Sequence, residues 1–554
     1  MITIGVNRGH NSAVCLMKDN EILFHTEDER LSRIKYHKYP FSVFQKIPQY
    51  TNHYNNLCVT GLTSLLNKCD NTSYARDMYT EHLSSLSPSF YESNTIIYDL
   101  GDSHHLMHSQ CAFYNSGFEE ATCIVIDDAG SSYDFTDKNG NPFYGRENTS
   151  TYILKYPNES TLIHKKVYFP IEDGDYIIDD NIELTRNISE SSAFGHTSKL
   201  FGFSVLDAGK VMGMASYGKE DDNIPDLIVD GKVRNDIFCS KDLLDVWIDF
   251  DYIKEDDFQR RANWAWKLQN QTQENILKYI LRMVETTGTR NVCLSGGYFL
   301  NCVANYYLQK NLPKDINLYV EPISSDAGTA MGAAKGLWYA KTGDTTIKKQ
   351  THIYYGVDYK YDIDEIKRKL IDEEYLFCKP EYIAKLLSNN NIVCLYQGKS
   401  ESGPRALGNR SILYNPTDPN GKDFVNTIKK REWFRPFAGT VLKEHTHEWF
   451  DLAGMDESPF MMYAVDVLHP DKIPAITHVD GTCRIQTLTK EQNHKYYEII
   501  EEFYKLTDVP MVFNTSFNLA GEPIVDSLDD ALYTLRNSDM KYLYLAEYGM
   551  LISK

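Results

Sequence analysis

The chain has 554 residues, more than one hydrophobic core normally holds, so two or more domains are expected. Acidic residues outnumber Lys and Arg by 77 to 57, which gives a formal net charge of −20. This excess argues against a general nucleic-acid or anionic-membrane binder, although it leaves room for a local basic pocket.

The first predicted element is a β-meander, with strands expected at residues 2–6, 13–17 and 21–24. No basic segment followed by an apolar core opens the chain, so we expect no signal peptide, and no run reaches the ~18 apolar residues of a membrane span. The 11 cysteines include no C-x-x-C pair, which is typical of reduced cysteines in a cytoplasmic protein.

A similar pattern returns further along the chain. A strand is expected at residues 122–126, followed by the turn Asp127-Asp128-Ala129-Gly130 and another strand at 151–154. Two copies of a strand, a polar turn and a second strand indicate a duplicated, two-lobed fold.

From about residue 260 the pattern changes to alternating helices and strands. The expected elements are a helix at 264–286, a strand at 291–294, a helix at 301–308, a strand at 316–320 and a helix of small residues at 327–340. Residues 341–346 are polar and resemble a linker, so we place a domain boundary near 350. The two domains are therefore expected at 1–349 and 350–554. Strands at 392–396 and 511–513 and helices at 491–507 and 527–537 are enough for the second domain.

The densest histidine cluster contains His104 and His108, which are four residues apart. On a helix they lie on one face and can bind one metal ion, although a histidine pair without metal fits the spacing equally well. No H-E-x-x-H motif is present. Asp127 and Asp326 stand where a strand end or a Gly-rich turn projects a carboxylate, but each could instead serve a turn or cap a helix. Two His and two Asp would suit iron, manganese or zinc.

Glycine loops and basic residues suggest phosphate binding. Ser295-Gly296-Gly297 follows a strand and precedes a helix, where backbone N–H groups can approach a phosphate. No Walker motif occurs. Arg and Lys are interleaved with Gly, Trp and Phe at 403–411 and 429–437, which indicates an anion pocket with aromatic walls. A solvated helix face is the alternative for residues 429–431.

These segments together resemble one family, the O-carbamoyltransferases of the NodU, CmcH and TobZ type. The resemblance runs in order through nearly the whole chain. Its most specific motifs are SDAGTAMGAA, GPRALGNRSIL, KKREWFRPFA, THVDGTCRIQT and NTSFNLAGEPIV.

The resemblance implies an α/β fold and a two-step reaction. The first domain would be Kae1-like, of the actin, Hsp70 and sugar-kinase class, and the second YrdC-like. The second domain would convert ATP and carbamoyl phosphate, with Mg²⁺ accompanying the ATP, into carbamoyl-adenylate and pyrophosphate. The first would transfer the carbamoyl group to a hydroxyl and release AMP.

The resemblance also implies roles for individual residues. His104, His108, Asp127 and Asp326 would bind Fe²⁺ or a similar divalent metal, with Asp128 leaving the choice between the two adjacent carboxylates open. His10 would act as a base on the hydroxyl or stabilise developing charge. Nucleotide and carbamoyl phosphate would contact Arg405, Arg410, Lys429, Arg435, Arg484, Asn514, Ser516 and Asn518, with Lys429 and Arg435 also catalytic. In the transfer domain, carbamoyl-adenylate would contact Arg30, Lys210, Gly213, Gly296, Gly297 and Asn301.

The acceptor is expected to be a small hydroxyl compound such as a sugar, an antibiotic-like molecule or a nucleotide. Residues 130–200 follow no assignable pattern and are expected to shape its pocket. A homodimer is compatible with the sequence, whereas nucleic acid and membrane partners are not expected. Two other enzyme classes remain open: a sugar-kinase-class phosphotransferase, which leaves the second domain unexplained, and a threonylcarbamoyl-type tRNA-modifying enzyme, which the net charge disfavours. A non-enzymatic nucleotide- and metal-binding module is the third alternative.

Overall fold

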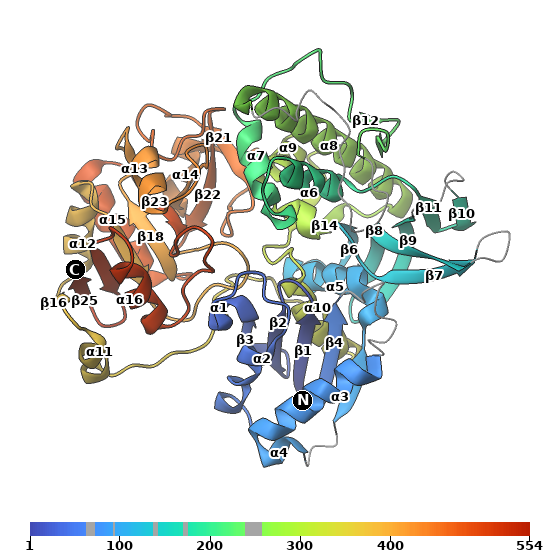
Figure 1. Cartoon of the computed structure of the whole chain (residues 1–554), viewed down its shortest axis with the longest axis horizontal. Coiled ribbons are helices and arrows are strands. Elements are labelled where there is room, and N and C mark those ends of the chain that lie inside the picture. The colour runs from blue at the N-terminus through green and yellow to red at the C-terminus, as the bar shows by residue number, and fades with distance from the viewer. Residues whose placement is uncertain (62–71, 92–94, 137–141, 170–175, 239–256) are drawn as a thin grey trace. The chain divides into compact units, whose positions relative to one another are not determined.

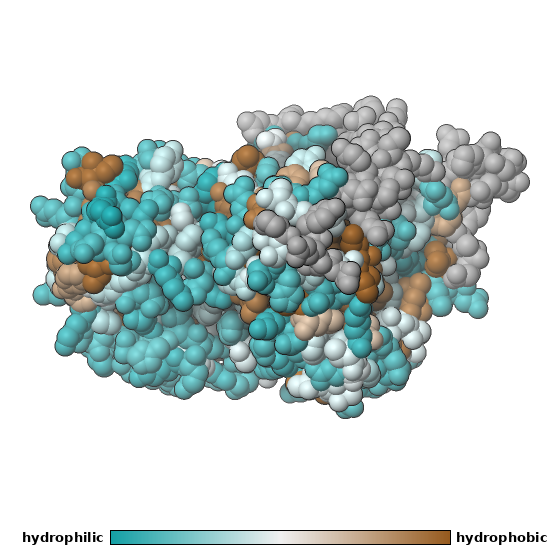
Figure 2. All heavy atoms as spheres, turned by 90° about the horizontal axis from the view of Figure 1, so that it is seen from below, coloured by the Kyte–Doolittle hydropathy of each residue, from teal (hydrophilic) through white to brown (hydrophobic). Residues whose placement is uncertain are grey.

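The computed structural model describes residues 1–61, 72–91, 95–136, 142–169, 176–238 and 257–554. The chain forms two compact units (Figure 1). The first comprises residues 1–28 and 36–350, and the second comprises residues 29–35 and 351–554. The surface seen in Figure 2 is mainly hydrophilic, with scattered hydrophobic residues. Among the described residues, no helix combines the length and the apolar character needed to cross a membrane.

The first unit opens with a five-stranded sheet. Its strands are β1 (Ile2–Arg8), β2 (Ala13–Lys18), β3 (Glu21–Glu27), β4 (Asn56–Gly61) and β5 (Ile96–Asp99). Their order is β3-β2-β1-β4-β5, with the meander β1 to β3 antiparallel and β4 and β5 parallel to β1. The predicted meander is therefore confirmed.

A second sheet repeats this arrangement. It contains β6 (Glu120–Ile126), β7 (Ser132–Thr136), β8 (Pro142–Lys155), β9 (Glu159–Tyr168), β10 (Tyr176–Asp179), β11 (Ile182–Thr185), β14 (Asn291–Ser295) and β15 (Asn317–Val320). Its core order is β9-β8-β6-β14-β15, again an antiparallel meander followed by two parallel strands. The matching order of the two sheets confirms the predicted duplication.

Two helices fill the space between the sheets. α10 (Ala327–Thr342) packs against β1, β2 and β4 of the first sheet, whereas α5 (His104–Ser116) packs against β6, β8 and β14 of the second. The two helices also pack against each other. Their approach is very close, because a methyl group added at Gly332 of α10 would overlap the carbonyl oxygen of Met107 in α5. The small residues of α10 thus bring the two sheets together.

Further helices cover the other faces of these sheets. The largest is α8 (Phe258–Thr287), which packs against β6 on the face opposite α5. The remaining elements are α2 (Phe41–Phe44), α3 (Thr72–Leu86), α4 (Pro88–Tyr91), α6 (Glu190–Leu200), α7 (Ala208–Ala215), α9 (Cys302–Asn311) and the hairpin β12 (Ile228–Val229) and β13 (Lys232–Val233).

The second unit is built on a ten-stranded mixed sheet in the order β16-β25-β24-β17-β18-β23-β19-β22-β21-β20. The strands are β16 (Glu374–Phe377), β17 (Val393–Tyr396), β18 (Arg410–Tyr414), β19 (Ala438–Leu442), β20 (Phe450–Asp451), β21 (Ala464–Val467), β22 (Thr482–Leu488), β23 (Met511–Ser516), β24 (Tyr542–Leu545) and β25 (Met550–Ser553). Its helices are α11 (Ile363–Lys369), α12 (Pro380–Ser388), α13 (Gly421–Ile428), α14 (Thr446–Trp449), α15 (His494–Thr507) and α16 (Leu528–Arg536). The predicted α/β class holds for both units.

A short N-terminal segment belongs to the second unit, which the sequence did not predict. Residues 29–35 include most of α1 (Asp28–Ser32). The Arg30 guanidinium, which is buried, donates to the carbonyl oxygen of Gly403 at 2.6 Å. Arg33 donates to the carbonyl oxygens of Ile524 and Pro523 at 2.7 and 2.9 Å. The second unit is therefore completed by seven residues from the start of the chain.

The close packing of α5 and α10 yields a stability prediction. Replacing Gly332 by Ala favours an isolated helix by up to about 1 kcal/mol. In the folded protein, however, the methyl group meets the Met107 carbonyl, so we expect Gly332→Ala to destabilise the first unit by about 1–3 kcal/mol. Urea unfolding measures the change. Ala340→Ser, on the exposed side of α10, is the control and should stay within about 0.5 kcal/mol of the wild type.

Candidate functional site

Four side chains that the sequence singled out meet in the first unit. His104 and His108 lie on α5, Asp127 directly follows β6, and Asp326 directly precedes α10. All four are buried. One ligand atom from each lies within 4.8 Å of all the others, which is the arrangement of a metal centre.

The distances within this cluster fit a metal ion. The two Nε2 atoms of His104 and His108 are 3.2 Å apart. Each of them lies 3.5–3.7 Å from Oδ2 of Asp127 and from Oδ1 of Asp326. Four ligands at about 2.1 Å from one ion in tetrahedral geometry are about 3.4 Å apart, so the donor set has the right size and chemistry for a divalent metal.

Neighbouring groups orient the ligand atoms. The backbone N–H groups of Asp128 and Gly297 donate to Oδ1 of Asp127 at 2.8 and 3.3 Å, which leaves Oδ2 facing the histidines. Ser295 Oγ lies 3.3 Å from Nδ1 of His108. Hydrogen bonds of this kind fix the orientation of a metal ligand.

The geometry separates alternatives that the sequence left open. The Asp128 side chain is exposed, whereas Asp127 is in the cluster. Asp326 occupies the N-cap position of α10, but its side chain makes no capping hydrogen bond and its carboxylate faces the histidines instead. The structure thus brings Asp127 and Asp326 to the histidine pair.

His10 lies beside this cluster. Its Nδ1 is 3.0 Å from Oδ2 of Asp326, and its side chain is 31% exposed. The negative charge of Asp326 raises the pKa of His10 to about 9. Burial and the histidines act on Asp326 in opposite directions, and the net effect lowers the pKa of this carboxyl well below its ordinary value. His10 and Asp326 therefore form an ion pair at the edge of the cluster.

The residues predicted to contact carbamoyl-adenylate in this unit are only partly brought together. Gly296 and Gly297 follow β14 and adjoin Asp127. Asn301 caps α9, with its Oδ1 accepting from the Ala304 N–H at 3.1 Å. Lys210 and Gly213 lie on α7, where Lys210 pairs with Asp207 at 3.2 Å.

Arg30, which the resemblance assigned to the carbamoyl-adenylate site of the first domain, lies in the second unit and donates to the Gly403 carbonyl oxygen. The segment after β3 takes its contacts from residues more than 350 positions away, which no local pattern reveals.

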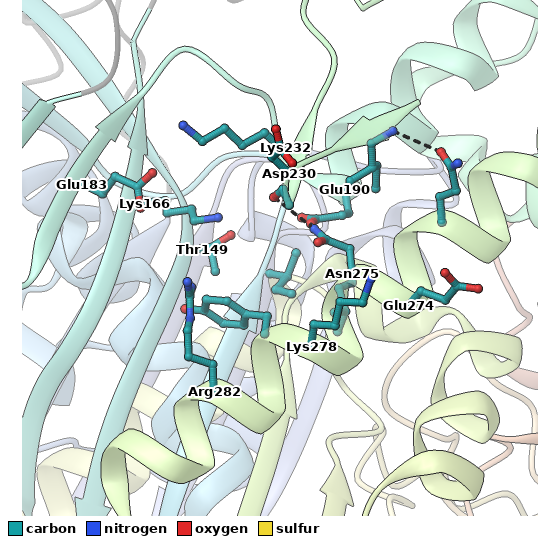
Figure 3. Close-up of a pocket in the computed structure, with 16 residues that line it drawn as sticks. Thr149, Lys166, Glu183, Glu190, Asp230, Lys232, Glu274, Asn275, Lys278 and Arg282 are labelled. Atoms are coloured by element: carbon teal, nitrogen blue, oxygen red, sulfur yellow. Dashed lines mark hydrogen bonds between the residues drawn. The ribbon is translucent and has the colours of Figure 1, made fainter. Parts of the chain in front are cut away.

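A polar cavity of about 590 Å³ lies between the strands of the second sheet and α8 (Figure 3). Thr149, Lys166, Glu183 and Glu190 line it from the 130–200 region, and Asn275 lines it from α8. Ile126 of β6 also lines it and is three residues from Cys123, which packs against α5. Residues at an odd spacing on a strand face opposite sides. The cavity and the metal cluster therefore lie on opposite faces of the second sheet.

The second unit contains a cluster of cationic residues. Lys429, the C-cap residue of α13, is only 2% exposed. Its Nζ donates to the Ser516 carbonyl oxygen and to Asn518 Oδ1, the latter at 3.0 Å, and lies 3.4 Å from Ser516 Oγ. The alternative of a solvated helix face is therefore wrong for Lys429.

Like charges crowd around this lysine. Burial, together with the positive charges of Arg431 and Arg435, lowers the pKa of Lys429 well below its ordinary value. Burial and the charges of Arg435 and Arg484 do the same to Arg431. Like charges therefore act on both Lys429 and Arg431, and Glu522 and Glu432 offset them only in part. Such a cluster is prepared for a polyanion, which would relieve the repulsion.

Other predicted pocket residues serve the framework. Arg410 is fully buried, and its guanidinium donates to the carbonyl oxygens of residues 397, 398, 409 and 526. Asn514 donates to the Ala406 carbonyl oxygen and to Thr440 Oγ1. Arg405 is half-buried in the loop between β17 and β18. The hydrogen bonds of Arg410 and Asn514 hold this loop in place.

Arg431 was not predicted as a site residue. Its guanidinium stacks on the Phe437 ring at 4.0 Å and donates to Asn426 Oδ1 and to the Pro436 carbonyl oxygen at 2.6 and 2.9 Å. It thereby braces the loop that carries Arg435. The sequence did contain a signal for this role, because aromatic residues follow Arg431 closely and arginine stacks on aromatic rings.

Comparison with known proteins agrees with these observations. Residues 98–335 match the family model for the carbamoyltransferase N-terminus, and residues 384–553 match that for the carbamoyltransferase C-terminus. Nodulation protein NolNO of Sinorhizobium fredii is 30% identical over 97% of this chain and 78% of its own length. Nodulation protein NolO of Bradyrhizobium diazoefficiens is 31% identical over 80% of this chain and 78% of its own length. Uncharacterized protein MJ1051 of Methanocaldococcus jannaschii is 30% identical over 100% and 99%.

Solved structures show only distant similarity. Full-length HypF in its phosphate- and nucleotide-bound form has a TM-score of 0.34 at 12% identity, covering 62% of this chain and 56% of its own. A ROK family protein from Streptococcus pneumoniae has a TM-score of 0.32 at 11% identity, covering 62% and 99%. The family models and the curated relatives decide the assignment: this chain belongs to the carbamoyltransferase family and is a carbamoyl-transferring enzyme.

Proposed function

We propose that this carbamoyltransferase is ATP-dependent and transfers the carbamoyl group to a hydroxyl of a small molecule by way of carbamoyl-adenylate. The observation that carries the proposal is the cation cluster of the second unit. A buried Lys429 close to the charges of Arg431 and Arg435 makes a site for a polyanion, and ATP and carbamoyl phosphate are polyanions. Family membership supports the carbamoyl group as the unit transferred, which sets phosphotransfer aside.

The first step is assigned to the second unit. Water hydrolyses carbamoyl phosphate to carbamate and phosphate; a carbamate oxygen then attacks the α-phosphorus of ATP, and pyrophosphate leaves. Lys429, Arg435 and Arg484 bind the phosphate oxygens and stabilise the charge that develops on the leaving group. Ser516 and Asn518 hold the Lys429 ammonium group in position. Mg²⁺ accompanies the ATP.

The second step is assigned to the first unit. The hydroxyl oxygen of the acceptor attacks the carbamoyl carbon, the bond from that carbon to the AMP oxygen breaks, and AMP leaves. His10, held by Asp326, takes the proton of the hydroxyl or, when protonated, stabilises charge on the carbamoyl oxygen. A divalent ion bound by His104, His108, Asp127 and Asp326, for which we favour iron, would supply Lewis-acid polarisation. We also assign Gly296 and Gly297 to this site; a side chain at Gly296 would overlap the Ile126 carbonyl oxygen, and one at Gly297 would approach Asp127 Oδ1.

The function is tested directly with candidate hydroxyl compounds, ATP, carbamoyl phosphate and Fe²⁺. We expect one acceptor to gain the mass of a single carbamoyl group and the nucleotide product to be AMP with pyrophosphate. Mass spectrometry and ion-exchange chromatography measure both. Formation of ADP in place of AMP would contradict the proposed adenylate.

His104→Ala separates the two steps. Removing one metal ligand should lower carbamoyl transfer at least about 100-fold, since even groups that only orient ligands are worth 10- to 100-fold. Pyrophosphate release from ATP and carbamoyl phosphate should persist, because the cation cluster is untouched. Asp128→Asn, at the exposed neighbour of Asp127, is the control and should keep both activities. Loss of pyrophosphate release in His104→Ala would show that the two steps are not divided in this way.

Arg435→Ala tests the other step. Losing one donor to the developing charge should slow pyrophosphate release about 100- to 1,000-fold. A coupled pyrophosphate assay measures the rate. Lys430→Ala, at an exposed lysine of the same loop, should leave the rate near that of the wild type. An unchanged rate in Arg435→Ala would remove this residue from the proposed nucleotide site.

A further inference from the structure

A buried glutamate that the proposed reaction does not use lies behind the metal cluster. Glu147 is on β8, and its side chain is 1% exposed. It contacts two different segments: the turn that follows Asp127 and the first residues of α5. These segments carry three of the four candidate metal ligands.

The turn is held by both the backbone and the side chain of Glu147. Its carbonyl oxygen accepts from the Gly130 N–H at 2.7 Å, and its N–H donates to the Ser131 carbonyl oxygen at 3.1 Å. Its Oε2 accepts from the Ser131 N–H at 2.8 Å. A side chain at Gly130 would overlap Glu147 and lie 2.7 Å from the His105 ring. Glycine is therefore required where the turn passes between these two residues.

The same carboxylate lies at the N-terminus of α5. Ser103, in the N-cap position, makes no side-chain hydrogen bond to the helix. The first N–H groups are satisfied from other elements instead: that of His104 donates to Ser131 Oγ at 3.1 Å, and that of His105 donates to Oε2 of Glu147 at 3.4 Å. A negative charge at a helix N-terminus is favourable, and it here fixes the first turn of the helix that carries both histidines.

The charge of Glu147 is balanced on its other side. Lys165 Nζ lies 2.9 Å from Oε1 and donates to Tyr133 OH at 2.6 Å, and Tyr133 OH donates to Oε1 at 3.4 Å. Burial acts to raise the pKa of Glu147, but His105, Lys165 and the Ser131 N–H outweigh it and hold the pKa at about 2. Oε1 thus faces the lysine, and Oε2 is left for the turn and the helix.

We propose that Glu147 is a positioning residue for the metal centre: one carboxylate ties the Asp127 turn to the start of α5 and so sets the spacing between Asp127 and His104. This inference rests on the proposed function, because it assumes that the four-residue cluster binds a metal. It assigns a role to a residue of the 130–200 region that is separate from the cavity in Figure 3.

An ion pair with Lys165 that only stabilised the fold would respond differently to the replacement of Glu147. If Glu147 served only to balance Lys165, replacing either residue would lower thermal stability and leave the metal ligands unaffected in the molecules that remain folded. If Glu147 positions the ligands, its replacement changes metal affinity and coordination geometry in folded protein. Metal binding therefore distinguishes the two roles.

The experiment uses full-length Glu147→Gln, which keeps the size of the side chain and removes its charge. Co²⁺ is titrated into folded wild type and variant, with affinity from calorimetry and coordination from the visible absorption of bound Co²⁺. We expect Co²⁺ affinity to fall 10- to 100-fold, as for other groups that orient ligands, with an altered spectrum. Carbamoyl transfer with Fe²⁺ should fall similarly, and pyrophosphate release should be unchanged.

Two further variants make the result decisive. Glu183→Gln breaks an ion pair with His164 on the same sheet, away from the turn, and should bind Co²⁺ like the wild type. Ser131→Ala removes the other acceptor at the start of α5 and should weaken Co²⁺ binding; it replaces Glu147→Gln if that variant does not fold. Wild-type affinity and spectrum in the folded Glu147 or Ser131 variant would overturn this inference alone. A wild-type protein that binds neither Co²⁺ nor Fe²⁺ would overturn the proposed metal centre and this inference with it.

Discussion

Two carboxylates and two imidazoles meet in the interior of the first unit, and much of that unit is arranged around keeping them there. Asp127 and Asp326 come from points 199 residues apart in sequence, and the histidines come from a third element. Burying two carboxylates together costs free energy unless cations, hydrogen bonds or a metal compensate. The histidines, the backbone N–H groups at residues 128 and 297 and the His10 imidazole provide this compensation.

The frame that keeps these ligands together is a pair of similar sheets with two helices between them. α10 begins at one ligand and α5 carries two others, so the contact between the helices also sets the distance between their ligands. This explains why α10 is rich in Gly and Ala along the face that meets α5. Larger side chains there would separate the helices and the ligands with them.

In the second unit the buried charges are positive rather than negative. Lys429 and Arg431 are buried near other cations. Among the described residues, their hydrogen-bond acceptors are carbonyl, hydroxyl and amide oxygens. Neutral acceptors orient a cation without cancelling its charge, and a bound anion would stabilise the charged forms of these residues. The proposed reaction assigns one step to each of these two sites of contrasting charge.

The sequence by itself determined the features that depend on local spacing. The His-x-x-x-His pair follows from helix geometry, the strands and helices from their hydrophobic periods, and the duplication from the repeated strand and turn pattern. Long motifs identified the family. Only the tertiary structure decided which of two adjacent carboxylates joins the histidines and that Lys429 is buried. It also decided that Arg410 donates its hydrogen bonds to backbone carbonyl oxygens and that Glu147 accepts one from the start of α5. The physical reason is that burial and hydrogen-bond partners are set by residues distant in sequence, as with Arg30, whose partner in the second unit is 373 positions away.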